Sequence, residues 1–243
     1  MEDGAAAAAK ESALRRPRGP RLIAVDGSAA SGKSSVGRLL AERLGYRFLD
    51  TGIMYRAITW AALDRGIDPH DAKALAALAS AIDMQVVLPP PGSAATARIR
   101  IDGDDVTDGL RSPEVDEAVS AVSQVAGVRE ALVRRQKEIA AGGHIVMAGR
   151  DIGTVVLADA PLKLYLDASL EERARRRHAD FVRVGHESSE AAVLEDLRRR
   201  DQTDSRRELS PMRAADDAVV IDTSGMTLEQ VLARALALAE AAA

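Results

Sequence analysis

A phosphate-binding loop near the start of the chain constrains its fold more than any other feature. Residues 27–34 have the sequence GSAASGKS and match the pattern G-x-x-x-x-G-K-[ST] at every defined position. The apolar run 21–26 precedes the loop, and residues 33–44 follow it with apolar side chains at helical spacing. In this order, inward-pointing backbone N–H groups and a helix N-terminus both attract phosphate. The sequence therefore predicts an α/β fold that binds a nucleoside triphosphate.

The rest of the chain alternates strand and helix patterns, which is typical of a parallel sheet with crossover helices. After the loop helix we expect a strand at Tyr46–Asp50 and a helix at Thr51–Arg65. Further buried-strand patterns occur at His144–Ala148, Leu162–Leu166 and Ala218–Ile221, and a helix over residues 227–240 follows the last of them.

Residues in the middle of the chain interrupt this alternation. Three short strand patterns occur there, at Met84–Leu88, Arg98–Ile101 and Asp104–Val106. The Asp102-Gly103 pair between the last two favours a hairpin, so we expect a small antiparallel insertion over residues 83–107, followed by helices near 113–125 and 128–141. Residues 1–20 lack apolar periodicity and are expected to be a disordered tail.

The composition excludes several classes of function. The chain has no cysteine, so disulfides, thiolate zinc sites and a thiol nucleophile are impossible. Aromatic residues make up 2% and the net charge is −4, which disfavours nucleic acid as a partner. No apolar run approaches the ~18 residues of a membrane helix, and no signal peptide is recognisable, so we expect a cytoplasmic protein with no membrane partner. The absence of asparagine excludes the Asn-Lys-x-Asp element of guanine-specific switches.

Polar residues follow the carboxyl ends of three predicted strands. The phosphate loop follows the first, residues 50–52 with Tyr55 and Arg56 follow the second, and residues 149–151 follow the third. The carboxyl ends of parallel strands open into one crevice, so these groups are expected to meet. Arginines in that crevice would neutralise the acceptor phosphate of a small kinase, in which two polyanions approach each other in line. Taken alone, Arg56 or Arg150 would more often be a surface or structural arginine. Together with the phosphate loop, the two arginines favour a kinase.

Two interpretations remain open for residues 171–213, which contain ten acidic and eleven basic residues. Four acid-first pairs occur at the i,i+4 spacing that stabilises helices, namely Glu171/Arg175, Glu172/Arg176, Glu195/Arg199 and Asp196/Arg200. Such pairs are typical of solvated helices. A mobile lid that brings arginines to the ATP phosphates would have the same composition.

Longer stretches of the chain resemble the bacterial cytidylate kinases. The resemblance rests on residues 26–34, 49–56, 120–126, 128–136, 149–156, 159–161, 166–174, 200–207 and 215–218, in this order. It covers nearly all of residues 21–240, and it implies a P-loop nucleoside-monophosphate kinase fold that transfers the γ-phosphoryl group of ATP to CMP or dCMP. It further implies a monomer whose core segments are 21–82, 131–170 and 208–243, with a monophosphate-binding insertion at 83–130 and a lid at 171–207.

The motif and the resemblance together assign candidate site residues. Towards ATP and Mg²⁺ these are Gly27, Ser28, Ala29, Ala30, Ser31, Gly32, Lys33, Ser34 and Ser35, with Ser34 as the metal contact, and Arg173, Arg176 or Arg177 from the lid. Towards the acceptor they are Thr51, Tyr55, Arg56, Ser123, Arg129, Arg150, Asp151, Arg200, Asp204 and Arg207. Lys33, Arg150 and Arg207 are expected to be catalytic.

Within the acceptor set, the resemblance implies that Ser123, Arg129 and Asp151 recognise cytosine. A carboxylate and a hydroxyl can accept from the exocyclic amine, while the arginine donates to ring N3 and O2. Uracil has a carbonyl in place of that amine and would be rejected. The resemblance further implies that Arg56, Arg150 and Arg207 hold the acceptor phosphate, that Arg200 and Asp204 hold the ribose hydroxyls, and that Thr51 and Tyr55 line the pocket.

One position departs from the family pattern. Family members often have aspartate directly before Gly-Arg-Asp, and this chain has Ala148. A second carboxylate on the metal side is therefore not expected, which leaves Ser34, the phosphates and water to bind Mg²⁺. No general base is required, because the acceptor phosphate is already an anionic nucleophile.

Two alternatives compete with this interpretation. Another P-loop kinase, acting on a different monophosphate or on a small alcohol such as shikimate, would share the loop, but a minimal metabolite kinase needs no antiparallel insertion. A non-catalytic ATP-binding regulator or an RNA-associated protein is disfavoured by the few aromatic residues and the balanced charge.

Overall fold

The computed structural model of the chain describes residues 19–183, 185, 188–207 and 209–242. Most of the predicted tail, residues 1–18, lies outside this part. Its last two residues are packed against the domain: Pro20 is buried, and the carbonyl of Gly19 accepts a hydrogen bond from the Tyr46 hydroxyl at 2.9 Å. The packed domain therefore begins two residues earlier than the sequence pattern predicts.

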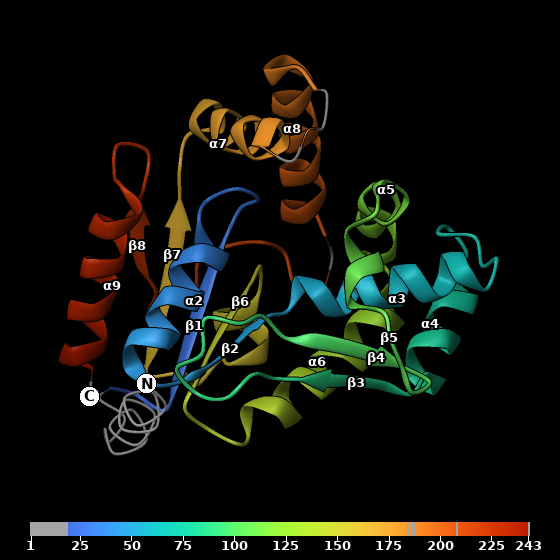
Figure 1. The fold of residues 1–243 in the computed structure, drawn as a ribbon, viewed down its shortest axis with the longest axis horizontal. Helices are drawn as coiled ribbons and strands as arrows, with labels where there is room; N and C mark the ends of the chain where they lie inside the picture. Colours follow the sequence, from blue (N-terminus) through green and yellow to red (C-terminus); the bar gives the residue numbers. More distant parts are fainter. Residues whose placement is uncertain (1–18, 184, 186–187, 208, 243) are drawn as a thin grey trace, which may run out of the picture.

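Five parallel strands form the central sheet, in the order β2-β6-β1-β7-β8 (Figure 1). Their bounds are β1 Leu22–Gly27, β2 Arg47–Asp50, β6 Ile145–Gly149, β7 Leu162–Asp167 and β8 Val219–Asp222. The central strand β1 is buried on both faces from its second residue onward, which explains its continuous apolar run. The predicted parallel sheet is confirmed.

Alternate side chains of the sheet pack against helices on opposite faces. Ile23 belongs to an apolar cluster with side chains of α2 and α9, whereas Ala24 belongs to a cluster with α3 and α6. The helices that cover the two faces are α2 Lys33–Leu44, α9 Leu228–Ala241, α3 Gly52–Asp64 and α6 Ala126–Ala140. The site is therefore built on a sheet that is covered on both sides, as in doubly wound folds.

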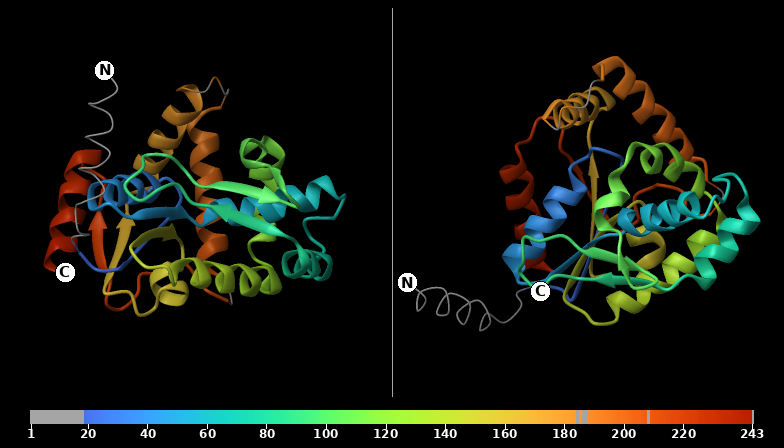
Figure 2. Two further views of the ribbon diagram at one scale, coloured as in Figure 1. Left: turned by 60° about the horizontal axis from the view of Figure 1, so that its bottom comes forward. Right: turned by 45° about the vertical axis from the view of Figure 1, so that its right-hand side comes forward.

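The predicted antiparallel insertion is present as a second, three-stranded sheet beside the first (Figure 2). Its region comprises α4 Ala72–Ala81, β3 Met84–Val87, β4 Arg98–Ile101, β5 Asp104–Asp105, the 3-10 helix η1 Thr107–Arg111 and α5 Pro113–Val122. Asp102 and Gly103 both have positive φ, as a tight hairpin turn requires. Helix α4 is absent from the sequence prediction, and α5 ends three residues earlier than predicted, at Val122.

The connection between β3 and β4 returns to the core of the domain. The backbone N–H of Gly92 donates to the carbonyl of Tyr46 at 2.9 Å, and the Arg38 guanidinium donates to the carbonyl of Ala94. The insertion is thus attached to the phosphate-loop helix as well as to its own flanking helices.

The helices α7 Leu170–Arg183 and α8 Glu190–Ser205 lie beyond the carboxyl ends of β1 and β7 (Figure 1, top). Ala174, Val193 and Leu197 form a small apolar cluster between them, and Ala29 and Ala30 of the phosphate loop pack against it. These charged helices therefore contact the loop.

Two of the four i,i+4 pairs noted in the sequence of these helices form ion pairs, Glu172–Arg176 and Asp196–Arg200. At the other two positions the partner is three residues away rather than four: Arg175 pairs with Glu172 and Arg199 with Asp196. The i,i+3 and i,i+4 positions are both neighbours on a helix surface, so one carboxylate can serve both.

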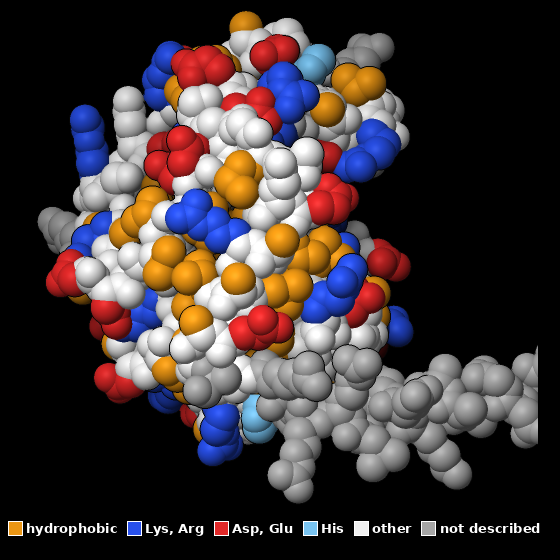
Figure 3. Space-filling model, turned by 90° about the vertical axis from the view of Figure 1, so that its left-hand side faces the viewer, with side chains coloured by type: hydrophobic (Ala, Val, Ile, Leu, Met, Phe, Trp, Pro, Cys, Tyr) orange, Lys and Arg blue, Asp and Glu red, His pale blue; other side chains and the backbone are white. Residues whose placement is uncertain are grey.

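The face on the α9 side of the molecule carries acidic and basic side chains interspersed with hydrophobic ones (Figure 3). No helix in the described part of the chain is long and apolar enough to cross a bilayer.

Candidate active site

The phosphate loop connects β1 to α2, and its first glycine is sterically required. Gly27 has a φ of +150°, and a Cβ at this position would lie 2.1 Å from the carbonyl oxygen of Leu166. Ala30 also has positive φ, so the loop curls around the N-terminus of α2. The free N–H groups and the positive end of the helix dipole at that point form a site for phosphate.

Lys33 is the first residue of α2, and its side chain bends back over the loop. Its Nζ donates to the carbonyl of Ser28 at 3.0 Å. Burial lowers the pKa of Lys33 to about 7, and the positive charge of Arg150 acts in the same direction. Lys33 is therefore held beside the loop in a position where a bound polyphosphate would supply the missing negative charge.

Ser34 and Asp50 bring two oxygen ligands together beside the loop. The Ser34 hydroxyl donates to Asp50 Oδ2 at 2.5 Å, and Asp50 Oδ1 accepts from the N–H of Gly52. Hydroxyl and carboxylate oxygens are the donors that Mg²⁺ prefers. No group of three or more His, Cys, Asp or Glu residues that could hold a metal occurs among the described residues. The Ser34–Asp50 pair offers two oxygen ligands, and phosphate oxygens and water would have to supply the others. Asp50 was not predicted as a metal contact.

Asp26, at the end of β1, is a structural element of the site that the sequence prediction missed. Its two carboxylate oxygens accept from the N–H groups of Ile152 and Gly153, both at 2.7 Å. These residues begin η2, a π-helix over Ile152–Val156. Burial raises the pKa of Asp26 to about 6, although the two N–H donors lower it. The carboxylate thereby fixes the turn that carries Arg150 and Asp151.

Arg150 projects from the end of β6 towards the phosphate loop. It forms an ion pair with Asp204 of α8 and donates to the carbonyl of Gly27 at 3.3 Å. Burial acts to lower the pKa of Arg150, but the charge and hydrogen bond of Asp204 outweigh it and raise the pKa. Arg207 lies 3.1 Å from the same carboxylate, and burial lowers its pKa. Two of the predicted phosphate-binding arginines thus converge on one carboxylate near the loop.

Arg56, the third arginine predicted to bind the acceptor phosphate, extends from α3. Its Nη2 lies 2.5 Å from Asp116 Oδ1, and its Nη1 donates to the carbonyl of Leu110. Asp116 belongs to α5 in the inserted region and is not among the predicted site residues. Arg200 of α8 also reaches α5, where its Nη2 donates to the main-chain carbonyl of Asp116 at 3.3 Å.

The residues predicted to recognise the base lie close together, where α5 ends, α6 begins and β6 ends. Arg129 and Asp151 form an ion pair whose side chains are only 4% and 6% exposed. Arg129 also donates to the carbonyl of Ser123 at 3.1 Å, and its guanidinium lies 5.4 Å from the centre of the Tyr55 ring. The Ser123 hydroxyl donates to the carbonyl of Ser120. Burial raises the pKa of Tyr55 to about 12, so its hydroxyl stays protonated.

The three arginines considered for the lid have different surroundings. Arg173 is buried, where it pairs with Asp201 and donates to the carbonyls of Ala168 and Ala29. Arg176 binds Glu172 and donates to both the hydroxyl and the carbonyl of Thr223. Arg177 lies over the ring of Phe181, and burial lowers its pKa.

A single cavity of about 1130 Å³ connects these groups. The predicted residues that line it are Ala29, Ala30, Ser31, Gly32, Lys33, Ser34, Ser35, Thr51, Tyr55, Arg56, Ser123, Arg129, Arg150, Arg176, Arg200, Asp204 and Arg207. Arg177, also a lid candidate, lines the cavity too, whereas the predicted residues Gly27, Ser28, Asp151 and Arg173 are buried and are not part of the lining. Asp116 and Ser120, which were not predicted, contribute to the lining. The phosphate loop and the acceptor-side residues therefore share one space.

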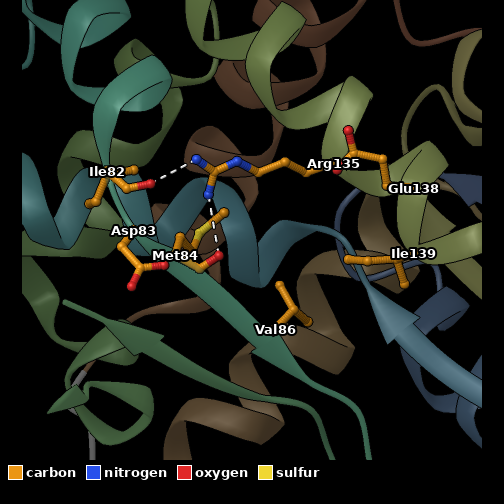
Figure 4. Close-up of a pocket in the computed structure, with 7 residues that line it drawn as sticks. All are labelled: Ile82, Asp83, Met84, Val86, Arg135, Glu138 and Ile139. Atoms are coloured by element: carbon orange, nitrogen blue, oxygen red, sulfur yellow. Dashed lines mark hydrogen bonds between the residues drawn. The ribbon is translucent and has the colours of Figure 1, made fainter. Parts of the chain in front are cut away.

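A smaller hollow of about 470 Å³ lies between α6 and β3 (Figure 4). Arg135 crosses it and donates to the carbonyls of Ile82, at 2.7 Å, and Met84, at 3.3 Å. These bonds attach α6 to the start of the inserted sheet, so Arg135 has a structural role here.

A phosphate loop at the end of a central parallel strand, facing a crevice with several arginines, defines a P-loop phosphotransferase. The family model for cytidylate kinase matches residues 23–241. The chain is 53% identical over 212 residues to a cytidylate kinase of Mycolicibacterium paratuberculosis, covering 87% of this chain and 91% of that one. It is 44% identical over 214 residues to a cytidylate kinase of Bacillus licheniformis, covering 88% and 93%. The chain belongs to the cytidylate kinase family.

Solved structures of other kinases are also similar to this chain. A gluconokinase from Sinorhizobium meliloti matches with a TM-score of 0.41 and 21% identity, covering 94% of this chain and 95% of that one. A shikimate kinase from Acinetobacter baumannii matches with a TM-score of 0.41 and 18% identity, covering 90% and 92%. The family assignment rests on the sequence matches.

Proposed function

We propose that this protein transfers the γ-phosphoryl group of ATP to CMP and dCMP by in-line displacement with Mg²⁺. The observation that carries the proposal is the single cavity in which the phosphate loop with Lys33 faces the acceptor-side arginines and Arg129. Membership of the cytidylate kinase family supports the choice of acceptor.

In this proposal the inserted region, residues 83–130, binds the monophosphate, and residues 171–207 close over the ATP phosphates. Helix α5 and the N-terminal half of α6 supply the base-side residues, while α7 and α8 contact the phosphate loop. Arg177 is the lid arginine that we favour for ATP, because it lines the cavity while Arg173 is buried against Asp201. Arg176 lines the cavity as well, but its guanidinium already binds Glu172 and Thr223.

Charge neutralisation supplies the acceleration. Lys33 neutralises the β- and γ-phosphates, and Arg150 and Arg207 bind the two reacting phosphates where negative charge spreads over the equatorial oxygens. Asp204, which pairs with both arginines, sets their orientation and binds the ribose together with Arg200. Ser34 and Asp50 would hold Mg²⁺, which would contribute positive charge against the phosphates.

Base recognition centres on the buried pair of Arg129 and Asp151. The pair fixes Arg129 so that its remaining N–H groups can donate to cytosine. Asp151 is buried and does not line the cavity, so its contact with the exocyclic amine requires the base to enter beyond the present lining. Ser123 and Ser120 both line the cavity at this end. The Ser123 hydroxyl donates to the Ser120 carbonyl and keeps its lone pairs, so it can still accept from the exocyclic amine.

A coupled assay of ADP release with CMP, dCMP, UMP and AMP tests the proposal, and CMP and dCMP should be the best acceptors. Asp151→Asn should narrow the ratio of kcat/KM for CMP over UMP, with a loss for CMP of about 1–3 kcal/mol per lost hydrogen bond. Arg150→Ala is the matched control, because a phosphate contact should slow all monophosphates by similar factors. AMP turnover equal to that of CMP would refute the acceptor assignment. Parallel losses for CMP and UMP in Asp151→Asn would refute its role in base recognition.

A further inference from the structure

The carboxylate of Asp116 holds Arg56 in the acceptor part of the cavity. Asp116 Oδ1 lies 2.5 Å from Arg56 Nη2, and the two side chains are 29% and 22% exposed. Arg56 Nη1 is bound separately by the carbonyl of Leu110. One edge of the guanidinium is therefore fixed by the protein backbone, while its charge is met by a side chain that lines the cavity.

Two further arginines lie near Asp116, and one of them, Arg200, pairs its own charge with Asp196. Arg200 of α8 donates to the main-chain carbonyl of Asp116, and the negative charge of Asp116 acts on Arg177 of α7. Arg56, Arg177 and Arg200 come from three different helices, and all of them line the cavity. Like charges gathered in this way repel one another unless an anion lies between them.

From this geometry we infer that Asp116 is an internal competitor of the acceptor phosphate. Its carboxylate occupies the place at Arg56 that a phosphate oxygen takes when the monophosphate binds, so binding exchanges one ion pair for another. A carboxylate and a phosphate offer an arginine similar oxygen acceptors, which makes the exchange chemically balanced. The inference deepens the proposed function and rests on it, because it requires Arg56 to bind the acceptor phosphate.

A different role for Asp116 would give the opposite result. If Asp116 only oriented Arg56 and stayed bound to it in the complex, its removal would weaken the binding of the monophosphate. A competitor has the reverse effect, because its removal leaves Arg56 free for the substrate. The sign of the change in affinity therefore separates the two roles.

Asp116→Asn tests the inference, since it removes the charge and keeps the size of the side chain. We expect the KM for CMP to fall by about fivefold, the scale of a partly exposed ion pair, with kcat and the KM for ATP unchanged. Asp116→Glu restores the charge and should return the KM for CMP towards that of the unmodified protein. Glu117→Gln is the matched control, because it removes the same charge from an exposed neighbour on α5 and should change none of these constants.

Thermal unfolding with and without CMP provides a readout that does not depend on turnover. At one fixed CMP concentration, CMP should raise the melting temperature of Asp116→Asn more than that of the unmodified protein, because tighter binding stabilises the folded state more. An unchanged or raised KM for CMP in Asp116→Asn, with an unchanged or smaller CMP-induced shift, would overturn the inference. If the unmodified protein phosphorylates CMP, that result refutes only the role of Asp116. If the unmodified protein does not phosphorylate CMP, the proposed function itself is refuted.

Discussion

The lowered pKa of Lys33 predicts that ATP binding takes up a proton. In the free protein, burial and the charge of Arg150 lower the pKa of Lys33 to about 7, so Lys33 is neutral in most molecules above pH 7.5. Bound phosphates favour the charged form and raise the pKa again. The unfolded chain also keeps its lysine protonated up to about pH 10.5, so without ATP the contribution of Lys33 to stability increases as the pH rises above 7. The affinity for ATP must therefore fall as the pH rises above 7.

The size of the effect follows from the fraction of Lys33 that is protonated before ATP binds. With a pKa of about 7 this fraction falls roughly 75-fold between pH 7.5 and 9.5, which corresponds to about 2.5 kcal/mol of binding free energy. The range from pH 7.5 to 9.5 lies above the second pKa of phosphate, about 6, and above the pKa of Asp26, about 6. It also lies below the pKa of about 12 for Tyr55.

Isothermal titration calorimetry of ATP with Mg²⁺, in buffers of different ionisation enthalpy, measures the Kd for ATP and the number of protons taken up per ATP bound. We expect close to one proton taken up per ATP at pH 8.5 and a Kd that rises steadily towards pH 9.5. In Lys33→Met, ATP should bind more weakly, and the pH dependence should disappear. A Kd that stays constant from pH 7.5 to 9.5 in the unmodified protein, without proton uptake, would show that Lys33 is already charged before ATP binds.

Three further predictions concern stability. Gly27→Ala should lower the free energy of unfolding by about 3 kcal/mol or more, since its Cβ would lie 2.1 Å from the Leu166 carbonyl; urea unfolding within 1 kcal/mol of the unmodified protein would contradict this. Arg129→Met strands a buried Asp151 and should cost about 3–5 kcal/mol in the same assay, so a loss below 1 kcal/mol would show that the pair is not effectively buried. Asp26 binds its proton more tightly in the folded state, with a pKa of about 6 instead of 3.8, so its contribution to stability falls as the pH rises from 3.8 to about 6. Relative to the unmodified protein, Asp26→Asn should therefore become steadily more stable over that range, and a constant difference would refute the assignment.

The fold and the family could be predicted because their signals are local in the sequence. The phosphate loop, the continuous apolar strands and the Asp102-Gly103 turn each depend on residues that are near neighbours in the chain. Helix α4 was missed, although Asp71 caps it by accepting from the N–H groups of Lys73 and Ala74. Its sequence is mostly alanine with only two leucines, so few large apolar side chains mark the helical spacing.

Other parts of the site depend on contacts that no local pattern encodes. The π-helix η2 is held by Asp26, a residue 126 positions earlier in the chain. The pairing of Arg56 with Asp116 joins residues 60 positions apart, and nothing in the sequence around Asp116 indicates it. The roles assigned to individual site residues stay predictions; what the structure adds is that nearly all of these residues line one cavity.

The attachment of α7 to Thr223 lies about halfway along that helix. Arg176, which binds Thr223, lies about 9 Å along the helix from Leu170, whereas Arg183 lies about 20 Å along it, at 1.5 Å per residue. A rotation about the first turn of α7 therefore displaces its far end about twice as far as the attached point. The Thr223 hydroxyl also lies 3.4 Å from the carbonyl of Ser31 in the phosphate loop. A rotation of α7 about its first turn would therefore move the outer end of the helix more than Thr223 and the phosphate loop.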